Sequence, residues 1–503
     1  MKRLSPIMLA GTGSDVGKSL IATGLCRIFL QDGYHPAPFK AQNMALNSYA
    51  TPDGFEIGRA QAVQAEAAGI PCSTDMNPLL LKPSGEHTSQ VVLNGKPVGN
   101  RNAYEYFRKE GREELRREVH DAFDRLASRF NPIVMEGAGS ISEINLRDSD
   151  LVNMSMARYA DAKVILVADI DRGGVFASAY GSIMLQDKED RKRIKGIIIN
   201  KFRGDMRLFD EGRKMMEEIC GVPVLGVVPM AKDIHIEEED SVALSAKGKS
   251  SALGLVNVAV VLLEHISNFT DFDILERNPS VNLFYTKHPD DLRTADIIII
   301  PGTKSTLSDL YALRRDGLAK VIVDEASKGK TVMGICGGYQ IMGKEICDPH
   351  HVEGDIEHLP GLGLLPTVTT LTEGKVTRQT SFRFMDMPEE CRGYEIHMGE
   401  TVMTGDYSPL NTLSVGSHEG CIANAAGSNS TDGNSTGNCL GTYIHGILDN
   451  KTVIDCLLKP FAGNQSVSDF DPIKYKEEQY DKLAALLRTH LNLPLLYQIM
   501  ETR

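Results

Sequence analysis

The sequence lacks the cysteine pairs, the basic surplus and the long apolar runs that characterise several classes of protein. Its nine cysteines are scattered singly without a C-x-x-C pair, which argues against a disulfide framework and against a zinc site. A formal net charge of −13 argues against nucleic acid or an anionic membrane as a partner, because no basic patch is large enough to reverse that field. No apolar run approaches membrane-spanning length, and the N-terminus lacks the hydrophobic region of a signal peptide. We therefore predict a protein of the reducing cytoplasm.

The composition is that of an ordinary globular protein, with 42% hydrophobic and 24% charged residues. A chain of 503 residues can form roughly two to four domains, each with its own core. Strand-like runs alternate with helical patterns in both halves, so we predict an α/β fold with doubly wound parallel sheets. A Ser/Asn/Gly/Thr tract from Asn424 to Asn438 predicts an inserted, disordered loop. The predicted divisions are residues 1–235, a linker 236–253, residues 254–455 and a helical tail 456–503.

A glycine-rich turn near the N-terminus predicts a phosphate site. It follows the apolar run Ile7–Ala10, which reads as a strand, and it leads into a helical pattern. Such a turn points backbone N–H groups and a helix N-terminus at one spot, which favours phosphate. Lys18 supplies a charge for the outer phosphates, and the Ser19 hydroxyl can bind magnesium. The loop is one residue longer than the commonest P-loop, and a glycine turn with a chance Lys-Ser pair is the alternative. The predicted nucleotide-binding residues are Gly11, Thr12, Gly13, Ser14, Asp15, Val16, Gly17, Lys18 and Ser19.

Three further polar residues follow apolar runs in the N-terminal half. Lys40 ends the second predicted strand, Glu136 ends a strand that begins near Ile133, and Asn200 ends an Ile-rich strand. Ligands of open parallel sheets bind at the carboxyl ends of the strands, so Lys40 and Asn200 are predicted to contact the nucleotide. Glu136 is predicted to hold magnesium, directly or through water. A surface lysine and an exposed loop glutamate are the alternatives.

A second chemical centre is predicted in the C-terminal half. Cys336 lies in a small-residue turn between a strand and a helix, where glycines tolerate the crowding around a strained nucleophile. His445 ends a strand and precedes a glycine, which suits a base that reaches a neighbouring loop. The turn from Pro301 to Ser305 follows an Ile-rich strand and is a candidate for the second oxyanion donor. A structural cysteine and a histidine with no catalytic role are the alternatives.

These motifs resemble known families. Gly334-Ile-Cys-Gly-Gly338 with Gly441-Thr-Tyr-Ile-His-Gly446 resembles a class I glutamine amidotransferase domain. The N-terminal half, with its long P-loop, Pro38–Lys40 and Glu136–Gly139, resembles the dethiobiotin-synthetase group of ATPases. The two halves in this order resemble the cobyric acid synthase family of cobalamin-pathway amidotransferases over nearly the whole chain. Further matching segments are Lys40–Ser48, Glu143–Asp148, Ala168–Phe176, Ile199–Gly204, Ile266–Phe272 and Gly393–Gly399.

The resemblance implies the chemistry and the substrates. It implies a glutamine-hydrolysing ligase in which Cys336 is the nucleophile and His445 the base. It implies ATP and Mg²⁺, L-glutamine, and adenosylcobyrinic acid a,c-diamide as the acceptor, amidated at carboxylates b, d, e and g; no tightly bound prosthetic group is expected. The glutamate that usually follows the histidine by two residues is replaced by Ile447, which suggests a dyad with Asp449 as a possible substitute. The alternatives are cobyrinic acid a,c-diamide synthase and a ParA-like nucleotide switch with an inert second domain.

Overall fold

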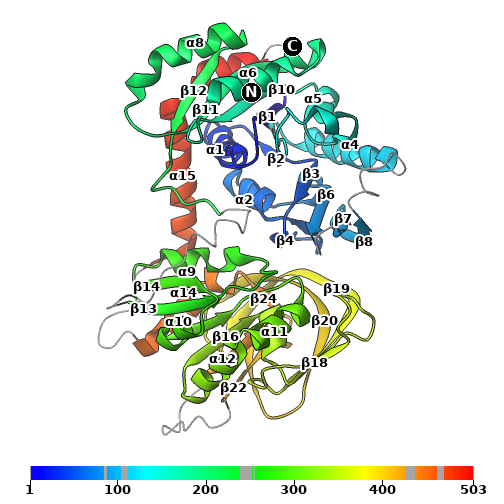
Figure 1. Cartoon of the computed structure of the whole chain (residues 1–503), viewed down its shortest axis with the longest axis vertical. Helices are drawn as coiled ribbons and strands as arrows, with labels where there is room; N and C mark the ends of the chain where they lie inside the picture. Colours follow the sequence, from blue (N-terminus) through cyan, green and yellow to red (C-terminus); the bar gives the residue numbers. More distant parts are fainter. Residues whose placement is uncertain are drawn as a thin grey trace. The chain divides into compact units, whose positions relative to one another are not determined.

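The computed structural model describes residues 2–83, 88–102, 112–237, 252, 255–425, 437–461 and 470–501. They form two compact units (Figure 1). Unit 1 comprises Met1–Ala45, Phe55–Glu237 and Lys474–Arg503, and unit 2 comprises Leu46–Gly54 and Glu238–Ile473. Most of the predicted linker and of the predicted Asn424 to Asn438 loop lies outside the described residues. None of the helices in the described part of the chain has both the length and the apolar character that a membrane span needs.

Unit 1 is built on a parallel sheet of six strands, as predicted. Their order is β12-β11-β10-β1-β9-β2, which places β1 at the interior of the sheet. Apolar residues fill the strands, and all five residues of β1 and all seven of β10 are buried, as expected for a sheet covered on both faces. The strands are β1 (Ile7–Gly11), β2 (Ala37–Phe39), β9 (Ile133–Glu136), β10 (Lys163–Asp169), β11 (Ile194–Phe202) and β12 (Val224–Pro229).

The helices that follow these strands include α1 (Lys18–Gln31), α2 (Arg59–Ala67), α4 (Arg112–Arg129), α5 (Met154–Tyr159), α6 (Val175–Met184), α7 (Lys188–Arg193) and α8 (Asp210–Cys220). The charged stretch that contains Leu115 and Leu126 forms α4, whose apolar face is buried. A small sheet that the Asn- and Gln-rich sequence did not predict adds β3 (Gln42–Met44), β6 (Leu79–Pro83), β7 (Thr88–Leu93) and β8 (Lys96–Asn102).

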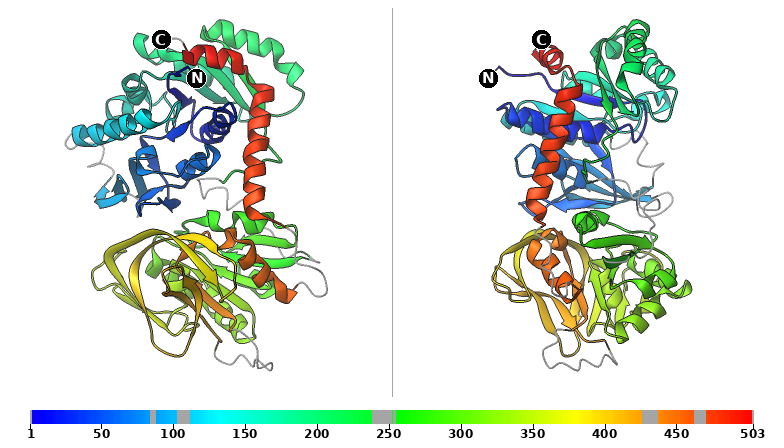
Figure 2. Two further views of the ribbon diagram at one scale, coloured as in Figure 1. Left: turned by 180° about the vertical axis from the view of Figure 1, so that it is seen from behind. Right: turned by 90° about the vertical axis from the view of Figure 1, so that its left-hand side faces the viewer.

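The C-terminal helices pack on unit 1. They are α15 (Pro472–His490) and α16 (Leu493–Glu501), and Figure 2 shows α15 in red running alongside this unit. A methyl group on Gly24 of α1 would lie 2.3 Å from Leu487, so the two helices pack at close range. Arg27 of α1 pairs with Asp481 at 2.7 Å, and Arg488 pairs with Asp32 at 2.6 Å. Residues 474–503 therefore group with unit 1, where the sequence predicted a separate tail from residue 456.

Unit 2 contains a mixed sheet of twelve strands. Its parallel part runs β14 (Val281–Thr286), β13 (Val256–Val261), β15 (Ile297–Ile300), β16 (Thr331–Ile335) and β23 (Cys439–Thr442). Its remaining strands, antiparallel except where β17 pairs with β19, are β17 (Glu345–Cys347), β18 (His358–Pro360), β19 (Thr367–Phe384), β20 (Cys391–Met403), β21 (Ser408–Leu413), β22 (His418–Ala423) and β24 (Ile444–His445). The helices are α9 (Asp273–Arg277), α10 (Pro289–Thr294), α11 (Thr306–Arg315), α12 (Leu318–Ser327), α13 (Gly337–Met342) and α14 (Lys451–Leu458).

A short segment from the N-terminal half also belongs to unit 2, which the predicted boundaries did not include. It contains β4 (Ser48–Ala50). The Tyr49 ring lies 4.4 Å from the ring of Tyr394 in β20, and Gln379 donates a 3.0 Å hydrogen bond to the Ala50 carbonyl. Aromatic packing and backbone bonding therefore hold residues 46–54 in this unit.

Candidate functional site

The glycine-rich turn of unit 1 forms a tight loop between β1 and α1. Asp15 and Gly17 have positive φ angles of 56° and 93°, and the Asn200 amide donates a 2.9 Å hydrogen bond to the Val16 carbonyl. A methyl group on Gly17 would lie 2.1 Å from that amide nitrogen, so only glycine fits here. Asn200, predicted to contact the nucleotide, thus also braces the loop.

Lys18 points back into this loop. Its Nζ atom donates hydrogen bonds to the carbonyls of Gly13 at 2.9 Å and Gly139 at 3.0 Å. Burial lowers the pKa of Lys18 to about 8, and the nearby Glu136 charge offsets only part of that effect. A phosphate beside Lys18 would favour its charged form. The buried amine therefore lies between the loop and Gly139, with its charge only partly balanced by Glu136.

The buried carboxylate of Glu136 is contacted by three polar side chains, of which two were predicted site residues and one was not. Ser19 donates to Glu136 Oε1 at 2.8 Å, and the Lys40 Nζ atom lies 3.0 Å from the same oxygen. Gln64 of α2 donates to Oε2 at 2.7 Å. Burial alone would raise the pKa of Glu136, but Lys40 and these hydrogen bonds hold it below its usual range. A serine hydroxyl beside an ionised carboxylate offers the oxygen ligands that Mg²⁺ prefers.

In unit 2 the sequence Gly334–Gly338 forms the predicted turn between β16 and α13. Cys336 has φ 52° and ψ −110°, a conformation that is strained for any residue with a side chain. A methyl group on Gly338 would lie 1.9 Å from the Ile300 carbonyl oxygen, and one on Gly334 would lie 2.6 Å from the Met342 sulfur. The flanking glycines are therefore required for the turn to fit against its neighbours.

His445 joins Cys336 to a carboxylate that the sequence did not point out. His445 Nδ1 lies 2.7 Å from Asp271 Oδ2, and the Gly446 N–H donates to Asp271 Oδ1 at 2.9 Å. Burial alone would lower the pKa of His445, but the charges of Asp271 and Cys336 and hydrogen bonds to both raise it to about 10. Since Nδ1 is bonded to Asp271, the hydrogen bond between His445 and the Cys336 side chain uses the other ring nitrogen. The three side chains form a Cys-His-Asp triad.

The expectation of a dyad with Asp449 as a possible substitute was therefore wrong. Asp449 follows His445 by four residues, whereas Asp271 lies 174 residues before it, next to the start of α9. A short sequence window around the histidine could not contain this carboxylate. The one available signal was the family-like segment Ile266–Phe272, which includes Asp271.

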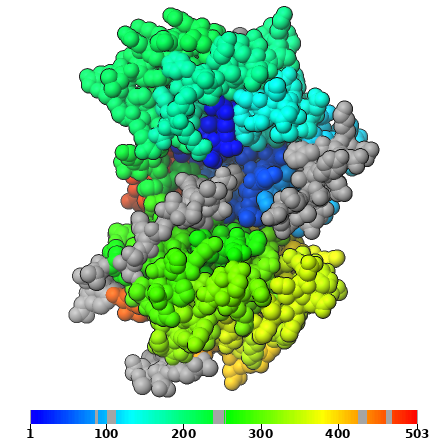
Figure 3. All heavy atoms as spheres, in the orientation of Figure 1, coloured from blue at the N-terminus to red at the C-terminus, as the bar shows by residue number. Residues whose placement is uncertain are grey.

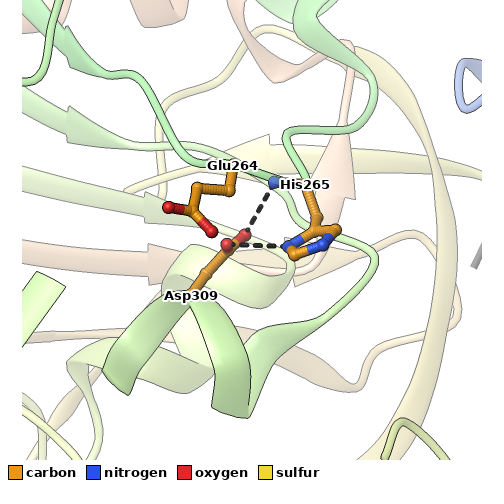
Figure 4. Close-up of side chains that lie close together, drawn as sticks. All are labelled: Glu264, His265 and Asp309. Atoms are coloured by element: carbon orange, nitrogen blue, oxygen red, sulfur yellow. Dashed lines mark hydrogen bonds and ion pairs between the residues drawn. The ribbon is translucent and has the colours of Figure 1, made fainter. Parts of the chain in front are cut away.

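The predicted oxyanion turn lies beside this triad. A methyl group on Gly302 would be 3.3 Å from the His445 ring, and one on Gly337 would be 3.0 Å from the Thr303 nitrogen. Figure 4 shows the cluster of Glu264, His265 and Asp309, which is bonded to this turn through Thr303. Asp309 accepts hydrogen bonds from Thr303 Oγ1 and from the His265 backbone, and its other oxygen lies 3.0 Å from His265 Nδ1. These bonds account for the cluster as a brace for the turn.

Two side chains that sequence reasoning missed, Glu419 and His397, contact the backbone or side chains next to His445. Glu419 accepts hydrogen bonds from Thr442 Oγ1 at 2.7 Å and from the Tyr443 N–H at 2.6 Å, and burial raises its pKa to about 7. The Thr442 carbonyl accepts the Cys336 N–H at 2.8 Å. The His397 ring stacks on the Tyr443 ring, with the two centroids 3.7 Å apart. The backbone between the cysteine turn and His445 is therefore fixed at several points.

Both halves of the chain match known protein families. Residues 7–242 match the family described as CobQ/CobB/MinD/ParA nucleotide binding domain, and residues 257–453 match the CobB/CobQ-like glutamine amidotransferase domain. Among solved structures, PurLQS from Thermotoga maritima matches with a TM-score of 0.29 and 16% identity, covering 46% of this chain and 97% of that one.

Curated relatives match along the entire length. Proteins named cobyric acid synthase from Bacteroides fragilis and Phocaeicola vulgatus are 68% and 67% identical, and each alignment covers 99% of both chains. The protein of that name from Parabacteroides distasonis is 54% identical over the same share. Identity at this level over both units confirms the resemblance seen in the motifs, and the chain belongs to the cobyric acid synthase family.

Proposed function

We propose that this protein is a glutamine-hydrolysing carbon–nitrogen ligase that amidates peripheral carboxylates of a corrinoid with ATP. The observation that carries the proposal is the Cys336–His445–Asp271 triad, found in a chain that also has a lysine- and serine-bearing phosphate loop. The acceptor is adenosylcobyrinic acid a,c-diamide, and amidation at carboxylates b, d, e and g gives adenosylcobyric acid in cobalamin biosynthesis. Membership of the family supports this choice of acceptor.

Glutamine is hydrolysed in unit 2. The Cys336 thiolate attacks the carboxamide carbon of glutamine, and His445 protonates the departing ammonia. Asp271 holds the imidazole by Nδ1, stabilises its charged form and leaves the other nitrogen facing the sulfur. Backbone N–H groups of the turn from Pro301 to Ser305 are our candidates for stabilising the oxyanion. Water then hydrolyses the thioester and frees the cysteine.

Carboxylate activation takes place in unit 1. MgATP binds the loop from Gly11 to Ser19, and a substrate carboxylate attacks the γ-phosphate to give an acyl phosphate. Lys18 and Lys40 compensate the charge that accumulates on the phosphates. Ser19 and Glu136 would hold Mg²⁺, which supplies further compensation when bound. Ammonia then displaces phosphate and forms the amide, and water must be kept away because acyl phosphates hydrolyse.

The domain limits follow from this division of labour. Residues 1–235 apart from 46–54 are assigned to the amide synthetase, which residues 474–503 complete, and residues 254–455 together with 46–54 are assigned to the amidotransferase. All nine cysteines are free thiols, which supports a reducing compartment, the cytoplasm.

The experiment that tests the proposal is a product count. Purified protein is incubated with ATP, Mg²⁺ and glutamine and either cobyrinic acid or its adenosylated a,c-diamide, and the amides added are counted by mass spectrometry. Four amides on the a,c-diamide are expected. Two amides on cobyrinic acid alone would instead identify a cobyrinic acid a,c-diamide synthase, and no amide on either would overturn the proposal.

A further inference from the structure

A small pocket opens in unit 1 against the phosphate loop. Its cavity volume is about 240 Å³. One wall, Gly139–Ile141, is bonded to the loop: Lys18 donates to the Gly139 carbonyl at 3.0 Å, Ser140 Oγ donates to the Thr12 carbonyl at 3.0 Å, and the Ile141 N–H donates to the Gly11 carbonyl at 3.1 Å. A group inside this pocket therefore lies against the wall whose Gly139 carbonyl accepts a hydrogen bond from Lys18. Figure 3 shows the first residues of the chain, in dark blue, exposed between the teal and cyan parts of this unit.

Two large apolar side chains in the lining of the pocket are exposed. Ile144 and Leu146, in the 3₁₀ segment Ile144–Ser149, line it although they are 51% and 44% exposed. Two further apolar residues of the lining, Leu151 and Val152, are buried. Large apolar side chains left in water beside a lined cavity mark a binding surface, because contact with an apolar ligand removes them from water.

The rest of the lining mixes small and apolar residues with polar ones, and its charged residues balance in sign. Arg147 and Arg158 supply two positive charges, and Glu143 and Asp150 supply two negative ones. Asp150 accepts hydrogen bonds from the Val152 and Asn153 N–H groups. Arg147 has five donor hydrogens and gives a hydrogen bond to the Leu185 carbonyl at 2.7 Å. A carboxylate or a carboxamide can be hydrogen-bonded by such a lining.

The size of the pocket limits what it can hold. Pockets that enclose a whole drug-sized ligand measure roughly 300–1,000 Å³. A cavity of about 240 Å³ is too small for a macrocycle and large enough for one of its side arms. A substrate whose carboxylate arms react one after another needs only such a pocket, because each arm in turn has to reach the phosphate.

We propose that this pocket holds the peripheral carboxylate arm that is being activated, while the apolar ring of the acceptor rests on Ile144 and Leu146. The assignment rests on the proposed function, since it names the place of the acceptor in that reaction. It makes residues 143–147 part of the acceptor site rather than a connecting loop.

The test is direct binding of the acceptor. The double variant Ile144→Ser/Leu146→Ser is compared with Leu208→Ser, which removes an equally apolar, 85% exposed side chain of the same unit outside the pocket. Binding of adenosylcobyrinic acid a,c-diamide is measured by equilibrium dialysis without ATP or glutamine. We expect the Kd of the double variant to rise about tenfold or more, and that of Leu208→Ser to stay unchanged. Leu146→Met, which keeps the apolar contact, should bind like the unaltered protein.

Further measurements distinguish a wrong pocket assignment from a wrong proposed function. The Kd for ATP, measured by calorimetry without the acceptor, and the thermal unfolding midpoint report on the folding of unit 1 and should not change in any of these variants. If the unaltered protein binds and amidates the corrinoid and the double variant binds it equally well, the pocket assignment is overturned. If the unaltered protein neither binds nor amidates the corrinoid, the proposed function itself is overturned, and the assignment with it.

Discussion

The phosphate site of unit 1 and the thiol site of unit 2 both lie where a strand gives way to a helix, but they treat a buried cation in opposite ways. Lys18 bonds to carbonyls of Gly13 and Gly139, and burial lowers its pKa to about 8. His445 is paired directly with Asp271, which helps to raise its pKa to about 10 despite burial. In the first site the charge of Glu136 offsets only part of the effect of burial on Lys18, whereas in the second the counter-charge of Asp271 is in direct contact with His445. A substitution that disables one site should therefore leave the reaction at the other site intact.

The largest effect is expected at the nucleophile. Cys336→Ala should lower glutamine-dependent amidation by about 10⁴-fold or more, because the variant has no group that can form the thioester. Amidation with added ammonium should persist, since unit 1 does not need the thiol. Both rates are measured by mass spectrometry of the corrinoid. Cys456→Ala, in α14, is the matched control and should change neither rate. Loss of both reactions in Cys336→Ala would contradict the separation of the two sites.

Lys18→Ala tests the other half of the comparison. We expect ATP-dependent amidation to fall about 10³-fold or more, whether ammonia comes from glutamine or from added ammonium, because the outer phosphates lose their fixed charge. Glutamine hydrolysis, measured as glutamate release, should continue. Lys192→Ala, which removes an exposed lysine of the same unit, serves as the control. An unchanged amide yield would refute the phosphate site.

Asp271→Asn removes the internal counter-charge from the thiol site. The kcat for glutamine hydrolysis should fall about 10²- to 10³-fold, because the imidazole loses both its orientation and the charge that stabilises its protonated form. Since Asp271 raises the pKa of His445, the variant should lose the imidazolium proton at a lower pH. The alkaline limb of the pH–rate profile should therefore shift to lower pH. Asp449→Asn should do neither. Equal effects of the two substitutions would make the triad untenable.

Gln64→Leu probes the support of Glu136. Because Gln64 donates to Glu136 Oε2, its loss should leave the carboxylate less well oriented and raise the Mg²⁺ concentration needed for nucleotide binding about tenfold. Calorimetric titration of the nucleotide at several Mg²⁺ concentrations measures this shift without turnover. A uniform loss of affinity with and without Mg²⁺ would point to the loop rather than to the metal.

The smallest effect concerns stability at Glu419. Burial raises the pKa of this glutamate from 4.5 to about 7, so the folded state holds its proton more tightly than the unfolded state does. Its contribution to stability therefore falls as pH rises from about 4.5 to 7 and is lowest above that range. The difference in unfolding free energy between Glu419→Gln and the unaltered protein should shift in favour of the variant over this window, by at most about 3 kcal/mol. A difference that is constant with pH would refute the shift.

The residues that the sequence revealed are those carried by short, continuous stretches. The turn from Gly11 to Ser19 and the turn around Cys336 each contain their own glycines, so both spacing and crowding could be inferred. Lys40 and Glu136 were found because each ends an apolar run, and parallel strands align their ends. Asp271, Gln64 and Glu419 were missed because their roles depend on contacts between distant segments. The antiparallel strands of unit 2 were not predicted for a related reason. β19 and β20 are long, partly exposed strands without continuous apolar runs.

The exchange of segments between the units bears on how the chain is made. Unit 1 takes its last two helices from residues 474–503, and unit 2 takes residues 46–54 from near the start. During synthesis, α1 emerges first but has no partner for Gly24 and Arg27 until α15 has left the ribosome. The first unit to be translated is thus the last to be finished. A gene fragment that stops after the nucleotide-binding half would yield a protein with an uncovered flank, and separate expression of the halves should begin by restoring both borrowed pieces.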